Sequence, residues 1–454
     1  MSTPCTVDLL IRYVDAGETY VAWRWLDTPT IPYADVVSPE HSAAVLARLD
    51  RSLPTAVDGE TEEQTLQRTL VAGELVNLDQ EQRLCRQLAQ TVLPVGLRSQ
   101  LRRRIRDGET IRIRVTPSPR LSRVPWELLA EDEYRLIEHA IIQYDPPSTL
   151  YAHRGRNPLD WPDVSELPAL HIVDPQLAAS TAGLHQLLTV AGTAAFEKHL
   201  GAYPDDKIIG VDEFSGPCVR PTIDRRQLAE LLDTTGLARL FYFGHVTANP
   251  GNPGSAAIHL SDTMSTSWGW AAPMGDGDRI EPDSQHRPFS ARDMLLGTAG
   301  APEHGLAQWR HQQGRAGYEI WKMPNRVAVI ACEGGADYRA IEPFGLVMAM
   351  LNAGAETVTT TRWALPTDHA FHRAHPGLNR TTVLPTTDLA LVVDLAHNDP
   401  DPIARLRAWQ LQCLTRWKAS GDIAVAPVVW ASLMTTHAPN RTTSPAAATP
   451  EALI

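Results

Sequence analysis

Residues 327–335 form an apolar run that ends in reactive and turn-forming residues, Val327-Ala328-Val329-Ile330-Ala331-Cys332-Glu333-Gly334-Gly335. A second run of this kind ends at a histidine, Leu240-Phe241-Tyr242-Phe243-Gly244-His245. Neither run alternates between apolar and polar residues, which is typical of strands buried on both faces of a parallel sheet. Ligands of open α/β sheets bind just beyond the carboxyl ends of the strands. We therefore expect the thiol of Cys332 and the imidazole of His245 to face each other across a crevice.

The composition is that of a globular protein and argues against several classes of partner. The 454 residues allow two or three domains, with 43% hydrophobic and 21% charged residues. A formal net charge of -12 argues against a direct nucleic-acid partner. The first residues lack a basic and then apolar leader, so we expect no secretory signal. No uninterrupted apolar stretch approaches the ~18 residues of a membrane span, so we expect no membrane insertion.

Cysteine and histidine spacing predicts neither a disulfide framework nor a metal site. The cysteines are odd in number, scattered and never in a CxxC pair: Cys5, Cys85, Cys218, Cys332 and Cys413. This usage is typical of a reducing, cytoplasmic protein. Histidines recur at three-residue steps from His369 to His375, but no Cys or Glu stands at a matching spacing, so we expect solvated surface there.

The first 150 residues predict an N-terminal α/β domain. We expect two strands within residues 7–27 joined by a turn at Gly17, strands at 111–115 and 136–142, and a helical stretch over 62–104 broken at Pro94. The Pro- and Arg-rich residues 146–168 predict a linker.

Residues 151–437 predict a second α/β domain that contains both reactive strand ends. The patterns indicate strands at 169–175, 357–363 and 426–431, and helices at 224–232, 342–352 and 401–421. Irregular residues 264–323 lie between the two reactive strands, and a stretch of that length is usually a functional loop or disordered, so a lid or specificity insert is one interpretation. Residues 438–454 lack large apolar side chains and predict a disordered tail.

From about Leu84 to Thr436 the chain resembles the CHAT family of caspase-like cysteine peptidases. The resemblance rests on the order of the segments as well as on their motifs. These are an early Pro-aromatic segment and strand at 121–142, a histidine strand at 237–245, an Ala-Cys-Glu strand at 327–333, a helix, strand and Trp-x-x-x-x-Asp turn over 344–368, and closing elements around Gln410 and Val429-Trp430-Ala431.

The resemblance implies an α/β fold with a caspase-like, mostly parallel sheet flanked by helices, preceded by a degenerate caspase-like half over residues 1–150. It implies cleavage of a protein substrate without a cofactor, under the control of a regulatory protein partner. Bacterial defence and programmed cell death are roles found in this family, and a gasdermin-like pore former is one kind of substrate. The chain departs from the family at Val246, where Gly or Ala often follows the histidine, and in the long segment before Cys332.

The expected chemistry is that of a Cys-His dyad. A thiol needs only deprotonation to become a nucleophile, so Cys332 would attack the scissile carbonyl while His245 holds the thiolate and protonates the leaving amine. The oxyanion would meet the backbone N–H of Cys332 and one N–H from a turn opened by Gly244 and His245, next to Val246. The alternative for Cys332 alone is a buried strand thiol, and the alternative for His245 alone is a hydrogen-bonded loop histidine.

Three further residues are candidates for a substrate pocket, each with an open structural alternative. Asp368 would favour a basic substrate side chain, or would cap a helix after Pro366. Trp363 would form a pocket wall, or pack in the core. Glu333 is a helper of the dyad at most, or a structural carboxylate.

Two functions of different class remain open. The first is a regulated cysteine endopeptidase, for which both reactive side-chain types are present. The second is a catalytically inactive caspase-like scaffold that binds a partner protein, and Val246 together with the long insert favours it. Side chains of His245 and Cys332 more than ~7 Å apart would also favour the scaffold.

Overall fold

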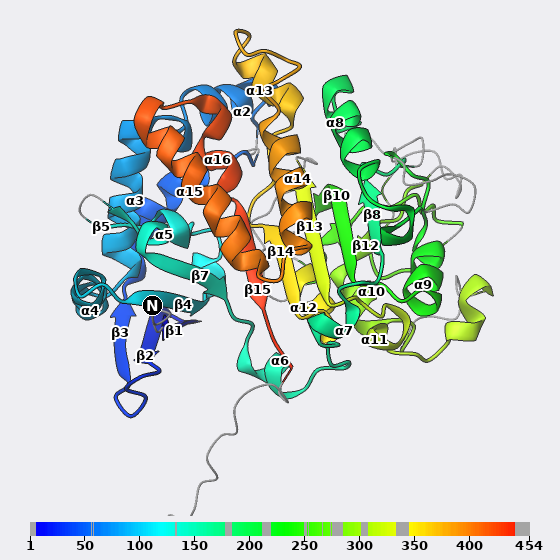
Figure 1. The fold of residues 1–454 in the computed structure, drawn as a ribbon, viewed down its shortest axis with the longest axis horizontal. Coiled ribbons are helices and arrows are strands. Elements are labelled where there is room, and N and C mark those ends of the chain that lie inside the picture. Colours follow the sequence, from blue (N-terminus) through cyan, green and yellow to red (C-terminus); the bar gives the residue numbers. More distant parts are fainter. Residues whose placement is uncertain are drawn as a thin grey trace, which may run out of the picture.

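One sheet runs through both halves of the chain, with the strand order β12-β11-β10-β13-β14-β15-β7-β4-β1-β2-β3. Figure 1 shows the N-terminal half beside the half that carries β10 and β13, with β15 at the seam. The computed structural model describes residues 6–440 except 56, 58, 132–133, 178–183, 211–218, 249–251, 253, 266, 273, 275–284, 301–306 and 333–344. The side chains of Tyr151, Ala307, Gln308 and Cys332 are also outside this description.

The N-terminal part of the sheet has one buried and one exposed face. Its strands are β1 (Thr6–Ala16), β2 (Glu18–Trp25), β3 (Tyr33–Val37), β4 (Thr110–Thr116) and β7 (Ala140–Tyr144). Strands β1, β4 and β7 are parallel, and a hairpin with Gly17 at φ 79° joins β1 to β2. Alternate residues of β2 and β4 are buried, which is typical of strands covered on one face only.

Helices cover the buried face of this part of the sheet. They include α1 (Pro39–Ser52), α3 (Leu78–Val92), α4 (Val95–Arg106) and, from the end of the chain, α15 (Pro402–Ser420). The predicted break at Pro94 is confirmed, since Pro94 separates α3 from α4. A further break follows α2 (Glu62–Leu66), where the chain forms short turns before Asn77 caps α3.

The second part of the sheet is buried on both faces. It contains β8 (Ala169–Val173), β10 (Arg239–Thr247), β13 (Arg326–Cys332) and β14 (Thr357–Thr361), all parallel. On one face, Phe241, Phe243 and Ile330 pack with α8 (Val190–Leu200) and α14 (Pro385–His397). On the other, Tyr242 and Val329 pack with α9 (Arg225–Thr234), α10 (Ala291–Leu296) and α12 (Leu346–Asn352).

Strand β15 (Leu433–His437) joins the two parts, because it pairs antiparallel with β14 and parallel with β7. The expected α/β class with a mostly parallel sheet flanked by helices is thereby confirmed. The division into domains at residue 150 remains a prediction. Residues 146–168 are a connector with two short helices, α6 (Ser148–Ala152) and α7 (Trp161–Val164).

Two expected strands were wrong in part or in full. Leu136–His139 is a short helix, α5, whose Glu138 carboxylate accepts the Arg135 N–H, and only β7 after it is a strand. Pro427–Trp430 is the helix α16 rather than the last strand, because Pro427 occupies its first turn. Of the expected tail, residues 441–454 lie outside the described residues.

The described part of the insert over 264–323 is folded. It contains β12 (Phe289–Ser290), α10 and α11 (Gly317–Ile320). The buried indoles of Trp268, Trp309 and Trp321 belong to the second hydrophobic core. Burial of these side chains orders the described residues of the insert, so disorder is wrong for them.

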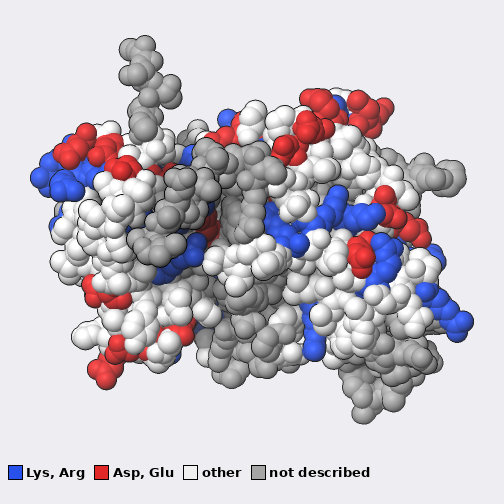
Figure 2. Space-filling view, turned by 90° about the horizontal axis from the view of Figure 1, so that it is seen from below, with Lys and Arg blue, Asp and Glu red and all other residues white. Residues whose placement is uncertain are grey.

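The described surface carries mixed charges. In the view of Figure 2, Lys and Arg side chains lie among Asp and Glu side chains rather than in one separate field. Among the residues that the structure describes, no helix is both long and apolar enough to cross a membrane.

Candidate active site

The register of two parallel strands places His245 beside Cys332. In the pairing of β10 with β13, Gly244 is the partner of Ala331 and His245 is the partner of Cys332. Neighbouring strands lie about 4.8 Å apart, so the two backbones are in direct contact at the carboxyl end of the sheet. Cys332 is the last residue of β13. Its side chain and the whole of Glu333 lie outside the described part of the structure.

The imidazole of His245 is buried and held in one orientation. Its Nε2 lies 2.7 Å from the carbonyl oxygen of His185. A carbonyl oxygen can only accept a hydrogen bond, so Nε2 carries the proton. In the neutral ring Nδ1 is then the basic nitrogen, which is the tautomer that a proton-accepting histidine needs at that atom.

Asp174 fixes the segment that supplies the His185 carbonyl. It follows β8 directly and accepts backbone N–H groups from Leu187 (3.2 Å) and Leu188 (3.3 Å). Its own N–H donates to Phe243 O (2.7 Å), on the strand that carries His245. Burial raises the pKa of Asp174, although these N–H groups and the nearby His245 act in the opposite direction.

The backbone of Asp174 is also unusual. Its φ is 48°, in the left-handed region that non-glycine residues rarely enter and that Asp enters more often than most. Such conformations persist where the surrounding structure holds them, and they cluster at functional sites. Asp174 and the His185 carbonyl were missed by the sequence analysis. Asp174 could have been found, because it ends a buried strand just as His245 and Cys332 do, whereas a carbonyl leaves no sequence signal.

The expected turn at Gly244 and His245 is absent, because β10 continues to Thr247. Val246 pairs with Ile258 of β11 (Ala257–Ile258) and is buried. A Cβ on Gly244 would lie 2.4 Å from the ring of Tyr242. Gly244 therefore makes room for Tyr242, whose hydroxyl donates to the carbonyl oxygen of His245 (2.8 Å). The expected second oxyanion donor from this turn has no support in the described residues.

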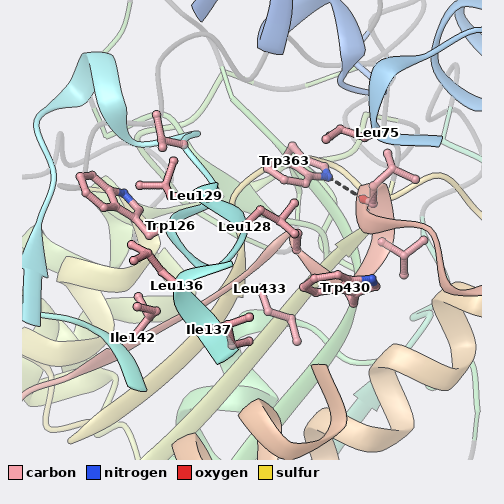
Figure 3. Close-up of a cluster of buried hydrophobic side chains, with 14 of the residues drawn as sticks. Leu75, Trp126, Leu128, Leu129, Leu136, Ile137, Ile142, Trp363, Trp430 and Leu433 are labelled. Atoms are coloured by element: carbon pink, nitrogen blue, oxygen red, sulfur yellow. Dashed lines mark hydrogen bonds between the residues drawn. The ribbon is translucent and has the colours of Figure 1, made fainter. Parts of the chain in front are cut away.

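Trp363 is part of the core and not of a pocket wall. Its side chain is 0% exposed, and its indole N–H donates to Val428 O (2.8 Å). Figure 3 shows Trp363 beside Leu128 and Trp430 in a cluster built from both halves of the chain. The expected role in substrate contact is therefore corrected in favour of core packing.

Asp368 is likewise buried. Its carboxylate accepts the Thr386 N–H (2.9 Å) and the Thr387 hydroxyl (2.5 Å), both in the first turn of α14. These bonds cap the amino end of that helix. Burial raises the pKa of Asp368, and the Thr387 and Thr386 donors oppose that rise. The expected selection of a basic substrate side chain by Asp368 is not supported, because the carboxylate is buried and already bonded.

A hollow opens at the carboxyl ends of the strands, on the face of the sheet that α12 covers. It is lined mainly by apolar side chains from both halves, including Val246, Val329, Ala331, Leu346, Met348 and Met434. Val246 follows His245, and Ala331 precedes Cys332. The two charged groups that the described residues contribute to its wall are already paired: Arg362 with Glu127 (2.9 Å) and Asp145 with Arg114 (2.8 Å). The hollow thus offers apolar surface at the edge where α/β proteins bind ligands.

The described residues contain no group of three or more His, Cys, Asp and Glu side chains that could hold a metal ion. In the histidine series after Asp368, His372 Nε2 donates to Val383 O and His375 Nε2 donates to Leu70 O, each at 2.8 Å. Both rings therefore connect segments of the chain.

Comparison with known proteins identifies one family. The CHAT domain matches residues 82–372, which is more than half of the chain. Among solved structures, a chain of the Saccharomyces cerevisiae separase-securin complex matches with a TM-score of 0.44 and 11% sequence identity, over 95% of this chain and 30% of that chain. This chain thus spans less than a third of the length of that one. A comparison with curated proteins found no match. From the extent of the CHAT domain match, the chain belongs to the CHAT domain family.

Proposed function

We propose that the protein is a regulated cysteine endopeptidase that cleaves a protein substrate with Cys332 and His245. The observation that carries this proposal is the register of β10 and β13, which sets these two residues side by side at the carboxyl end of the sheet. Membership of the CHAT domain family supports it, because the family resemblance implies caspase-like cysteine peptidases.

In the proposed reaction, Nδ1 of His245 accepts the proton of the Cys332 thiol. The resulting thiolate attacks the scissile carbonyl carbon and forms a tetrahedral oxyanion, which the Cys332 backbone N–H stabilises. The C–N bond then breaks as the amine leaves with the proton held by His245. A water molecule gives one proton to His245 as its oxygen attacks the thioester carbon. The C–S bond then breaks, the carboxylic acid product leaves, and His245 returns its proton to the Cys332 sulfur.

The surroundings of His245 suit this cycle. The His185 carbonyl accepts a hydrogen bond from Nε2–H in both charge states of the ring, so the ring keeps its orientation when Nδ1 gains a proton. The positive ring that forms is stabilised by the nearby carboxylate of Asp174. Because His245 is 5% exposed, little water competes for these interactions.

The substrate in this proposal is a polypeptide that lies across the carboxyl edge of the sheet, beside the hollow. We place the reaction in the cytoplasm, in bacterial defence or programmed cell death, with a gasdermin-like pore former as one candidate substrate and a partner protein as the regulator. These assignments rest on the family resemblance.

The test is a survey of new protein N-termini in a bacterial lysate incubated with the wild-type protein, Cys332→Ala or His245→Ala. We expect cuts with the wild-type protein that both variants lose. A matched control is Cys413→Ala, because burial raises the pKa of Cys413 to about 12 and makes that thiol unreactive. Cuts that persist in Cys332→Ala would refute the mechanism.

A second candidate is the inactive scaffold that binds a partner protein. The continuation of β10 to Thr247 favours it, because the expected second oxyanion donor from a Gly244 turn is missing. Site-specific alkylation distinguishes the two candidates. A peptidase requires a Cys332 thiol that titrates well below ~8.5, whereas a scaffold allows one that never reacts.

A further inference from the structure

Two more histidines lie behind the ring of His245. The His259 ring is perpendicular to the His245 ring, with the centroids 6.4 Å apart and an interplanar angle of 82°. The His286 ring is nearly parallel to that of His259, with centroids 5.0 Å apart. Both His259 and His286 are 0% exposed. His259 directly follows β11, the short strand that pairs with the end of β10.

A hydrogen bond joins the His259 and His286 rings, and their other hydrogen bonds give this pair a defined direction. His286 Nδ1 lies 3.0 Å from the carbonyl oxygen of Asp262, so Nδ1 carries the proton of that ring. His286 Nε2 must then accept, and it lies 2.9 Å from His259 Nδ1, which donates. His259 Nε2 in turn accepts from the hydroxyl of Thr247 (2.9 Å).

This assignment requires both rings to be neutral, and their surroundings keep them so. Burial lowers the pKa of His259 well below its usual value, with the charges of His286 and His245 adding to the effect. Burial also lowers the pKa of His286 to about 4. The pair therefore has one tautomer at neutral pH, and a positive charge can form on His245 without a second one beside it.

The far end of the chain is anchored in the insert. The Asp262 carboxylate accepts the backbone N–H of Arg225 (3.1 Å) and pairs with its guanidinium (3.3 Å). The same guanidinium donates to Trp268 O (2.7 Å) and to Pro288 O (2.8 Å). Arg225, at the start of α9, thus contacts Asp262, Trp268 and Pro288 at once. These contacts restrict movement of the His286 ring.

From this geometry we infer that Thr247, His259 and His286 are positioning residues for His245. They form a rigid, neutral wall against its imidazole on the side of β11, so that Nδ1 keeps its direction through the proton transfers. The inference rests on the proposed function and adds to it a role for the insert, which supplies His286. A displacement of about 1 Å at a catalytic group can lower a rate by as much as about 100-fold, so such a wall has a measurable effect.

The test uses two conservative changes at Thr247. Thr247→Val removes the only hydroxyl that the described residues offer to His259 Nε2, while Thr247→Ser retains it. The first readout is the ring ¹⁵N spectrum of His245, recorded without substrate. We expect sharp His245 ring signals in the wild-type protein and in Thr247→Ser, and signals broadened by motion of the ring in Thr247→Val.

The second readout is the pH midpoint of Cys332 alkylation, followed by site-specific mass spectrometry. We expect Thr247→Val to raise the midpoint by about one pH unit. It should lower kcat at least about tenfold and change KM less than about twofold. Thr247→Ser should keep the wild-type midpoint and kcat. Thr415→Val is the matched control, because that hydroxyl also makes one hydrogen bond but lies on α15, far along the chain from the site.

The two readouts separate this inference from the proposed function. An unchanged His245 spectrum in folded Thr247→Val protein would overturn the inference. An ordinary midpoint near 8.5 in the wild-type protein would overturn the peptidase, and the ring spectrum would still decide whether Thr247 positions His245.

Discussion

Removing the charge of Glu127 is expected to destabilise the protein strongly, because Glu127 holds a buried arginine at the seam of the two halves. Arg362 is 1% exposed, and its guanidinium lies 3.0 and 2.9 Å from the two carboxylate oxygens of Glu127. The same guanidinium donates to Val124 O (2.6 Å) and to Leu433 O. Glu127 and Val124 belong to the N-terminal half, and Arg362 follows β14.

Glu127→Gln keeps the side-chain volume and leaves the guanidinium buried without its counter-charge. Breaking a buried ion pair in this way costs about 3–5 kcal/mol, which is a large part of the about 5–15 kcal/mol by which folded domains are stable. Replacing both residues by methionine should recover only part of the loss, because the Val124 and Leu433 carbonyl oxygens would lose their donor.

The assay is urea unfolding, with the midpoint and the slope compared between variants. The matched control is Arg416→Gln, because the Arg416 guanidinium is 61% exposed in its ion pair with Asp422 and such pairs contribute about 0–1 kcal/mol. A loss below about 1 kcal/mol for Glu127→Gln would refute the reasoning. It would mean that the seam does not depend on this pair.

Three further outcomes are expected. Asp368→Ala should lower the free energy of unfolding, measured in urea, by about 1–2 kcal/mol, because the first turn of α14 loses its cap. The same variant should leave the cleavage-site preference in an N-terminus survey unchanged. A changed preference would identify Asp368 as a pocket residue. Asp174→Ala should lower the cleavage rate of a model substrate. It should also lower the free energy of unfolding by about 1–3 kcal/mol, because two buried N–H groups lose their acceptor. A wild-type cleavage rate would contradict this. His286 has a folded pKa of about 4, below the unfolded value of about 6.5, so its neutral state stabilises the fold above pH 6.5 and this contribution is lost as the pH falls towards 4. Between these limits the free energy of unfolding of the wild-type protein should fall with decreasing pH by about 1.4 kcal/mol per pH unit more than that of His286→Gln. Equal slopes of unfolding free energy against pH in the two proteins would contradict the assigned pKa.

The strand ends were predictable from sequence because burial on both faces leaves a plain signal. The runs that end at His245 and Cys332 contain almost only apolar residues, and parallel strands of similar length bring their carboxyl ends to one edge. The register that pairs the two residues follows from this arrangement, and the structure shows it.

Other parts were not predictable, each for its own physical reason. Helix α14 is buried around most of its surface, including Thr387, Asp394 and His397, so it has no helical alternation of apolar and polar residues. The sequence therefore allowed Asp368 as a cap after Pro366 but did not show that the helix it caps is α14. The bond from His245 to the His185 carbonyl depends on the path of the backbone, which no side chain encodes.

The histidine chain was missed because its members look unrelated in the sequence. His259 precedes the insert and His286 lies within it, and each alone is more often a hydrogen-bonded core residue than part of a site. Only the pairing of Val246 with Ile258 brings them behind His245. The insert was expected as a lid or as disorder because its composition shows neither helical nor strand periodicity. Three of its four tryptophans are buried and stabilise it.

The measurement that tests the central claim most directly is the pH dependence of Cys332 alkylation in the wild-type protein and in His245→Gln. Mass spectrometry assigns the label to each cysteine, and burial keeps the pKa of both Cys85 and Cys413 far above the pH range used. A Cys-His dyad predicts a wild-type midpoint well below ~8.5 that moves upward in His245→Gln. A midpoint near 8.5 or above in both proteins would contradict the dyad, and with it the proposed peptidase.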